Sequence, residues 1–180
     1  VYSPDSNTLA VKVGYPFDET ETEHDGNIWF FDVDNLEKIQ HTKTMKVYCA
    51  GKGIKYNPKG NTILIRMYKD RNTTEKKLEL WDAKIMQYIT TLCMDSDKYE
   101  YSPDGKIIVL AKDSKVYLLD AETGKEKMSF DVNYKERIDK VMASNNSNNV
   151  AIIFGDKTLQ IWDISKIWDE RLSGKDKIPI

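Results

Sequence analysis

The sequence predicts an all-β fold made of four consecutive units, each a four-stranded antiparallel sheet. Two observations predict it. A turn signal recurs four times, with its copies 54, 45 and 42 residues apart. Between the turns, runs of five or six residues rich in β-branched side chains recur in the same order, and runs of this length and composition favour strands over helices.

The turn signal combines a proline with small polar residues. Pro presets φ at the second position of a turn, and Asp, Asn or Gly accept the conformations that the following positions need. The fourth copy is degenerate because it has no proline. The copies are Tyr2-Ser3-Pro4-Asp5-Ser6, Tyr56-Asn57-Pro58-Lys59-Gly60, Tyr101-Ser102-Pro103-Asp104-Gly105 and Ala143-Ser144-Asn145-Asn146-Ser147.

Each turn is followed by two predicted strands. The first strands are at residues 8–13, 62–67, 107–111 and 150–154. The second strands, which end in Asp, are at residues 28–32, 78–82, 116–120 and 159–163. A weaker strand is expected after each Asp, for example at residues 126–130. A further strand is expected before each turn, at residues 47–56, 98–101 and 138–143, whereas only Val1 precedes Tyr2 in the first unit.

This order of turn, strand, loop and strand ending in Trp-Asp resembles the WD40 repeat, whose period is about 40–45 residues. Trp-Asp is intact at residues 81–82 and 162–163, while Phe31-Asp32 and Leu119-Asp120 keep only the Asp. The Gly-His pair of that family is absent from all four copies, so the repeats are degenerate. Residues 119–125 are also similar to the blade turn of YVTN and quinoprotein-like propellers.

The resemblance covers nearly the whole chain and implies consecutive blades of a β-propeller. The implied blades are residues 1–44, 45–94, 95–133 and 134–173, with residues 174–180 as a tail or the start of a further blade. Because WD40-like rings usually contain more than four blades, we expect a partial propeller. A β-sandwich is the alternative for the same strand pattern, but it gives no reason for the regular recurrence of Trp-Asp.

The repeated aromatic and acidic residues have structural roles in this prediction. Aromatic rings shortly before each Asp are expected in the packing between sheets, where large rings stabilise stacking. These rings are Trp29, Trp81, Tyr117 and Trp162. The repeated carboxylates are expected to accept hydrogen bonds from the backbone of the following turn rather than to act as acids. These carboxylates are Asp32, Asp82, Asp120 and Asp163.

The composition excludes several classes of function. Twenty-seven basic against 29 acidic side chains give a formal net charge of −2, which argues against a general nucleic-acid-binding protein. No apolar run is long enough to cross a bilayer and no signal peptide is visible, so we expect a cytoplasmic protein that does not bind membranes. Cys49 and Cys93 are too few for a disulfide framework, and we expect both to be thiols.

The sequence contains no recognisable catalytic motif. It has no Gly-x-Ser-x-Gly nucleophile elbow and no Gly-rich phosphate-binding loop. His24 and His41 are expected in solvent, and the spacing of the histidines and cysteines follows no zinc pattern. Residues 21–32 match a calcium loop only in part, because Glu21 stands where the first ligand should be Asp. We therefore expect no catalytic residue, no metal and no cofactor.

Two charged loops are the candidate partner-binding site. The loop at residues 15–27 is acidic and the loop at residues 68–77 is mainly basic. Each joins the second strand of a unit to the third, so both are expected on the same face. Opposite charges there would orient a protein partner, although the same loops equally suit plain solvation. The candidate residues are Asp18, Glu19, Glu21, Glu23, Asp25, Lys69, Arg71, Lys76 and Lys77.

The sequence thus predicts a non-catalytic scaffold that binds protein partners through one face of a WD40-like propeller. Propellers host many functions, so this prediction rests partly on the fold. The alternative is the propeller portion of a larger enzyme or sensor, of quinoprotein-like or propeller-peptidase type, whose chemistry lies outside these residues. A structural fragment without activity of its own is a third possibility.

Overall fold

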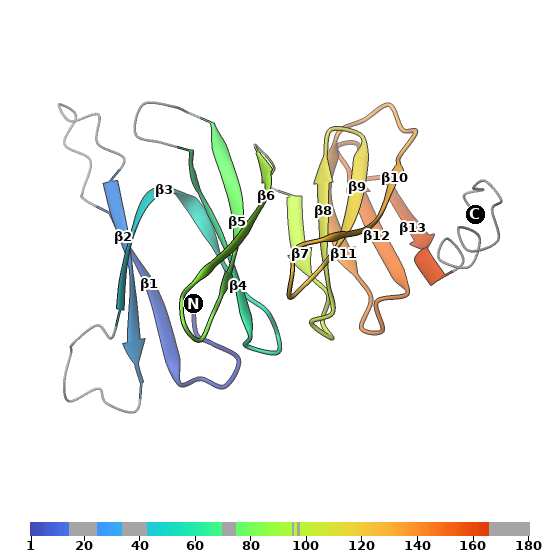
Figure 1. The fold of residues 1–180 in the computed structure, drawn as a ribbon. Coiled ribbons are helices and arrows are strands. Elements are labelled where there is room, and N and C mark those ends of the chain that lie inside the picture. Colours follow the sequence, from blue (N-terminus) through green and yellow to red (C-terminus); the bar gives the residue numbers. More distant parts are fainter. Residues whose placement is uncertain (15–24, 34–42, 70–74, 95, 97, 166–180) are drawn as a thin grey trace. The chain divides into compact units, whose positions relative to one another are not determined.

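The computed structural model describes residues 1–14, 25–33, 43–69, 75–94, 96 and 98–165. These residues are mainly strands joined by turns, so the predicted all-β fold class is confirmed (Figure 1). The chain divides into two compact units, unit 1 at Val1–Asp95 and unit 2 at Ser96–Ile180, which are described one at a time.

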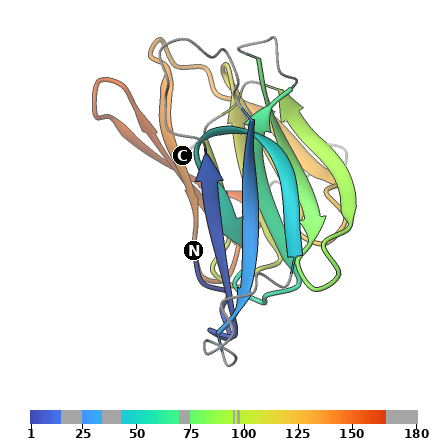
Figure 2. The ribbon, with the colours of Figure 1, turned by 90° about the vertical axis from the view of Figure 1, so that its left-hand side faces the viewer.

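Among its described residues, unit 1 has six antiparallel strands in sequence order. They are β1 (Thr8–Gly14), β2 (Asp25–Asp32), β3 (Lys43–Tyr56), β4 (Thr62–Tyr68), β5 (Lys76–Asp82) and β6 (Tyr88–Met94). The long strand β3 pairs with β2 through its first half and with β4 through its second half. It therefore belongs to two sheets: sheet A, with β1 and β2, and sheet B, with β4, β5 and β6. Figure 2 shows unit 1 from its sheet A side.

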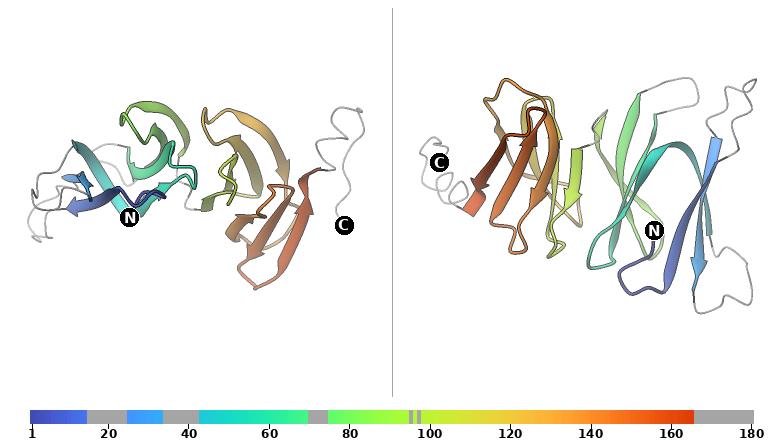
Figure 3. Two further views of the ribbon diagram at one scale, coloured as in Figure 1. Left: turned by 90° about the horizontal axis from the view of Figure 1, so that it is seen from below. Right: turned by 180° about the vertical axis from the view of Figure 1, so that it is seen from behind.

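Unit 2 contains two further antiparallel sheets (Figure 3). Sheet C consists of β7 (Lys98–Tyr101), β8 (Ile107–Lys112), β9 (Lys115–Asp120) and β10 (Glu126–Asp131). Sheet D consists of β11 (Ile138–Ala143), β12 (Asn149–Phe154) and β13 (Leu159–Asp163). Within the described residues, sheets B and C have the expected four strands and sheet D has three. The predicted strands that fall on described residues are present, with ends shifted by a few residues at most, whereas the strand expected after Asp163 lies outside the described residues.

The four sheets share one pairing register. The second residue of each turn copy is polar: Ser3, Asn57, Ser102 or Ser144. The residue five positions after it begins the register of the following strand and pairs with the Asp that ends the neighbouring strand. These pairs are Thr8↔Asp32, Thr62↔Asp82, Ile107↔Asp120 and Asn149↔Asp163. The residue after each Asp then donates its backbone N–H to a carbonyl at the end of the turn. These bonds are Val33 to Asn7, Ala83 to Asn61, Ala121 to Lys106 and Ile164 to Asn148, at 2.8, 3.0, 3.1 and 2.8 Å.

The predicted turns have one geometry in all four copies, including the degenerate one. In the third copy, the Ser102 N–H donates to the Ile107 carbonyl and the Gly105 N–H donates to the Ser102 carbonyl, and the other three turns repeat both bonds. The last turn residue is left-handed in every copy, a conformation that Gly adopts most readily. Its φ is 63° at Ser6, 74° at Gly60, 66° at Gly105 and 56° at Ser147.

Within each unit, two sheets pack face to face. In unit 1, sheet A contributes Ala10, Ile28 and Phe30 to the shared core, and sheet B contributes Ile63, Ile65 and Met67. In unit 2, sheet C contributes Val109, Val116, Leu118, Met128 and Phe130, and sheet D contributes Val141, Val150, Ile152 and Phe154. We call the side of a sheet that faces the next sheet in the chain its following face, and the opposite side its preceding face.

The shared register assigns side chains to these faces. In a strand that ends in Asp, residues two and four positions before the Asp lie on the following face, as Phe30 and Leu118 do. The residue directly before the Asp lies on the preceding face, as Trp81 and Trp162 do, each packed against the core of its unit. The predicted packing role is therefore confirmed for these two tryptophans. Trp29 contacts Phe31 edge-on in its own strand, and Lys115 lies over the ring of Tyr117.

Strand β3 joins two sheets because it bends. The register of the β3–β4 pair shifts between Cys49 and Ile54, and β3 forms an arch there (Figure 1). Gly53 lies in this bulge, where a Cβ would stand 2.6 Å from the carbonyl oxygen of Arg66 and 2.8 Å from its Cβ. At the arch, the backbone of β3 at Gly53 therefore lies so close to the β4 backbone at Arg66 that only glycine fits.

The substitution Gly53→Ala should lower the free energy of unfolding by about 2 kcal/mol, because the new methyl group must displace the β4 backbone. Urea denaturation measures this change. Gly155→Ala is the matched control, since its new methyl group would meet only the side chains of Arg137 and Glu136, at 3.5 Å or more. Equal stability of the two variants would show that the bulge tolerates a side chain.

Candidate functional site

The acidic part of the predicted partner site lies largely outside the described residues. Asp18, Glu19, Glu21 and Glu23 are in the segment at residues 15–24, and Arg71 of the basic loop is in the segment at residues 70–74. Asp25 is the first residue of β2 and pairs with Tyr48 in the register of sheet A. The proposed attraction between the two loops therefore stays a prediction.

The described basic residues of that site interact with groups of their own sheet. The Lys69 Nζ lies 2.9 Å from Glu75 Oε2, and the Lys77 Nζ lies 2.6 Å from Glu79 Oε1. Lys76 lies over the ring of Tyr68, with its Nζ 5.6 Å from the ring centre. The two ion pairs offset the charges of Lys69 and Lys77, so the described part of this loop is a weaker anion-binding surface than its sequence indicates.

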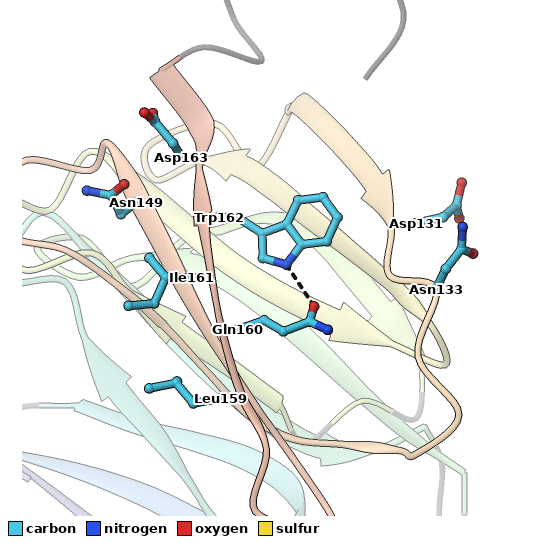
Figure 4. Close-up of a pocket in the computed structure, with 8 residues that line it drawn as sticks. All are labelled: Asp131, Asn133, Asn149, Leu159, Gln160, Ile161, Trp162 and Asp163. Atoms are coloured by element: carbon cyan, nitrogen blue, oxygen red, sulfur yellow. Dashed lines mark hydrogen bonds between the residues drawn. The ribbon is translucent and has the colours of Figure 1, made fainter. Parts of the chain in front are cut away.

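A different surface, along β13 in sheet D, forms an open groove of about 560 Å³ (Figure 4). It is lined by Asp131, Asn133, Asn149, Leu159, Gln160, Ile161, Trp162 and Asp163. Side chains alternate along β13, so Leu159 and Ile161 point to one side while Gln160 and Trp162 point to the other, toward Asp131 and Asn133. The groove thus presents Leu159 and Ile161 on one side of β13, and the amide of Gln160 with the polar groups of Asp131 and Asn133 on the other.

Trp162 fixes the floor of this groove. Its indole stacks on Phe130 of sheet C with 4.7 Å between ring centres and an interplanar angle of 25°. Its Nε1 donates a hydrogen bond of 3.2 Å to Gln160 Oε1, which holds the amide beside the ring. Trp81 in sheet B makes the same bond, to Glu79 Oε2 at 3.0 Å. The arrangement is therefore part of the repeat, and it pre-orders the polar side of the groove.

The groove follows the outer edge of a sheet. In sheets B and C, the strand that ends in Asp pairs with a fourth strand, β6 or β10. In sheet D, β13 is the outermost strand among the described residues. Leu159 and Ile161 are 55% and 61% exposed there. An edge strand offers a row of backbone donors and acceptors, so the groove combines main-chain pairing with side-chain recognition.

The repeated carboxylates accept hydrogen bonds from the backbone of the turns that follow them. Asp82 Oδ1 accepts bonds from the backbone N–H groups of Lys84 and Ile85, and Asp120 Oδ1 accepts them from Glu122 and Thr123. Asp163 Oδ1 accepts a bond from the Ser165 N–H. The predicted turn-stabilising role is therefore confirmed for these three residues, and for Asp32 it stays a prediction.

Asp104 and Asp120 in unit 2 have depressed pKa values. Burial raises the pKa of Asp104, but bonds from the Ser147 and Ser102 hydroxyls and the Lys106 backbone outweigh it and lower the pKa to about 2. Burial likewise raises the pKa of Asp120, but the Lys127 ammonium at 2.8 Å and the Thr123 amide hold it well below its usual range. Both groups are ionised near neutral pH, where they accept hydrogen bonds and have no proton to give.

The described residues hold no group of three or more His, Cys, Asp or Glu side chains that would suit a metal ion. Cys93 in β6 is a thiol rather than half of a disulfide, as expected. Among the same residues, no helix has the length and apolarity needed to cross a membrane.

The comparisons with known proteins identify no family. The chain matches no protein-family model, and it matches no curated protein.

The β13 groove was not among the sites predicted from the sequence. Its side chains belong to the repeat, and Leu159 and Ile161 occupy the positions of Val116 and Leu118, which are fully buried. Exposure depends on neighbouring sheets, so the strand pattern alone does not reveal it.

Acid should remove the contribution of Asp104 to stability. Its pKa of about 2 in the folded protein lies below the ordinary 3.8, so ionisation of Asp104 stabilises the fold above about pH 4, and this contribution is lost as pH falls toward 2. Asp104→Asn should therefore lower stability at pH 7, and its difference from the parent should shrink by pH 2. Urea unfolding at several pH values measures this, with Asp113→Asn, at an exposed turn, as control. A difference independent of pH would contradict the assignment.

Proposed function

We propose that this chain is a non-catalytic protein-binding scaffold with WD40-like propeller architecture, and that the β13 groove binds an extended peptide of a partner protein. The groove carries the binding proposal, because it joins an edge strand to a preformed set of apolar and acidic side chains. The shared register of the four sheets supports the architecture.

The propeller proposal rests on repetition. Propeller blades are small antiparallel sheets that pack face to face in chain order. In each unit here, the following face of one sheet packs against the preceding face of the next, through equivalent positions. The intact Trp-Asp pairs add to this, since both tryptophans make the same indole bond and lie on the preceding face. A pair of unrelated sandwiches would not require the same register four times.

The binding proposal rests on the chemistry of the groove. A peptide strand pairing with β13 would place alternate side chains beside Leu159 and Ile161, and the others beside Gln160, Trp162 and Asp131. Aliphatic residues suit the first side. Lys or Arg residues suit the second, because Asp131 brings negative charge to that side of the groove. The preferred ligand is therefore an extended segment in which aliphatic and basic residues alternate.

A short fluorescent peptide in which Val alternates with Lys should bind the chain with measurable anisotropy, and a version with Pro at its centre should not, because Pro lacks the N–H needed for pairing. Asp131→Lys should weaken binding roughly five- to tenfold, since an attraction becomes a repulsion. Glu122→Lys makes the same charge change at an exposed site outside the groove and should leave binding unchanged.

Two results would overturn the groove assignment. One is binding of the Pro-containing peptide with equal affinity, which would mean that charge alone attracts it. The other is no binding of either peptide by the folded chain, as expected if another segment of this chain already pairs with β13.

A further inference from the structure

Asp131 and Asn133 form the wall of the groove that faces Gln160 on β13 (Figure 4). Between these two residues, Val132 is 2% exposed and packs in the core of unit 2. Side chains of an extended segment alternate, so the residues on either side of a buried one point outward together. Both Asp131 and Asn133 are exposed, as this alternation requires. The wall therefore offers a carboxylate and an amide oxygen side by side, two residues apart in the chain.

The two side-chain amides that line the groove differ in what they already bind. Gln160 Oε1 accepts the hydrogen bond of 3.2 Å from the Trp162 indole. For Asn133, no hydrogen bond joins the amide to another residue in the described part of unit 2. An amide oxygen accepts hydrogen bonds from a cation as well as from a neutral donor. The amide of Asn133 can therefore turn its oxygen toward a bound ammonium or guanidinium group without giving up such a bond.

Tyr134 ties the segment that carries Asn133 to the turn that leads into β13. Its ring packs on Phe154, with 4.3 Å between ring centres. Its hydroxyl donates a hydrogen bond of 2.7 Å to Asp156 Oδ2. A tyrosine hydroxyl has only one proton, so in its 2.8 Å bond with Thr158 Oγ1 the threonine is the donor. Thr158 directly precedes β13, and these bonds therefore set the spacing between the two walls of the groove.

These bonds restrain the walls in a way that apolar packing alone does not. The burial of apolar surface, as between Trp162 and Phe130, has little directionality. A hydrogen bond weakens steeply when its distance or angle changes. The Thr158 backbone N–H and the Tyr134 hydroxyl lower the pKa of Asp156, so this acceptor is ionised near neutral pH and its bonds are of the stronger, charge-assisted kind.

We propose that Tyr134 is a positioning residue that holds Asn133 beside Asp131, so that the amide oxygen and the carboxylate together accept hydrogen bonds from one Lys or Arg side chain of the bound peptide. This inference rests on the proposed function of the groove and extends it, because it names the pair of residues that selects the basic positions of the peptide. An ammonium group has three donors and a guanidinium group has five, so either can serve both acceptors.

Fluorescence anisotropy with two peptides tests the proposal. One is the peptide in which Val alternates with Lys, and in the other every Lys is replaced by Thr. Tyr134→Phe keeps the ring on Phe154 and removes both hydroxyl bonds, so it should weaken binding of the Lys peptide about fivefold and change binding of the Thr peptide little. Asn133→Ala should have the same selective effect. Equal losses for the two peptides would mean that Tyr134 only supports the fold, and would overturn the proposal.

A double-mutant cycle shows whether Tyr134 acts through Asn133. In the Asn133→Ala background, Tyr134→Phe should cost little further affinity for the Lys peptide, whereas the same loss in both backgrounds would contradict the positioning role. Tyr88→Phe is the matched control, because it removes an exposed hydroxyl that bonds to Thr91 Oγ1 at 3.0 Å in β6, outside the groove. This control should bind both peptides as the parent does.

The same measurements separate this inference from the proposed function. Failure of the parent chain to bind the Lys peptide would overturn both. Binding of that peptide by the parent and by Tyr134→Phe with equal affinity would overturn only the role of Tyr134, and would leave the groove as the peptide-binding site.

Discussion

In each sheet, the strand after the repeated turn pairs with the strand that ends in Asp, and the register of this pair is the same in all four sheets. The rest of the structure depends on this register. A backbone bond from the residue after the Asp returns to the turn that began the pair of strands, and the Asp carboxylates of the second, third and fourth copies hold the chain reversal that follows. Side chains alternate with a period of two, so a shift by one residue would turn the apolar face of a strand outward. The register therefore decides which side chains can form a core.

The stacking of sheets follows from that assignment. Aliphatic residues two and four positions before the Asp cover the next sheet, and the residue directly before the Asp meets the previous one. Trp162, the residue directly before Asp163, stacks on Phe130 of the previous sheet. The same indole also donates a hydrogen bond that orders the amide of Gln160 in the groove. Core packing and the candidate binding surface thus share a residue.

Much of this architecture could be predicted from the sequence, because its signals are local. The turn residues and β-branched runs gave strands that match β7, β11 and β13 residue for residue. The arch of β3 could not be predicted, since its need for Gly53 arises from the approach of Arg66 on a neighbouring strand. The groove could not be predicted either, because the exposure of Ile161 depends on which sheets surround it. For the basic loop, counting charges overestimates the positive charge available to a partner. Lys69 and Lys77 form ion pairs with Glu75 and Glu79, which lie close to them in the sequence.

Amide hydrogen exchange followed by NMR tests the shared register most directly. The amides to compare are those of Val33, Ala83, Ala121 and Ile164, each of which donates to a turn carbonyl. The account predicts that all four exchange far more slowly than in an unfolded peptide, as a group, because each closes an equivalent pair of strands. Exchange of Val33 or Ile164 at the unprotected rate, with Ala83 and Ala121 protected, would contradict a register common to the four sheets.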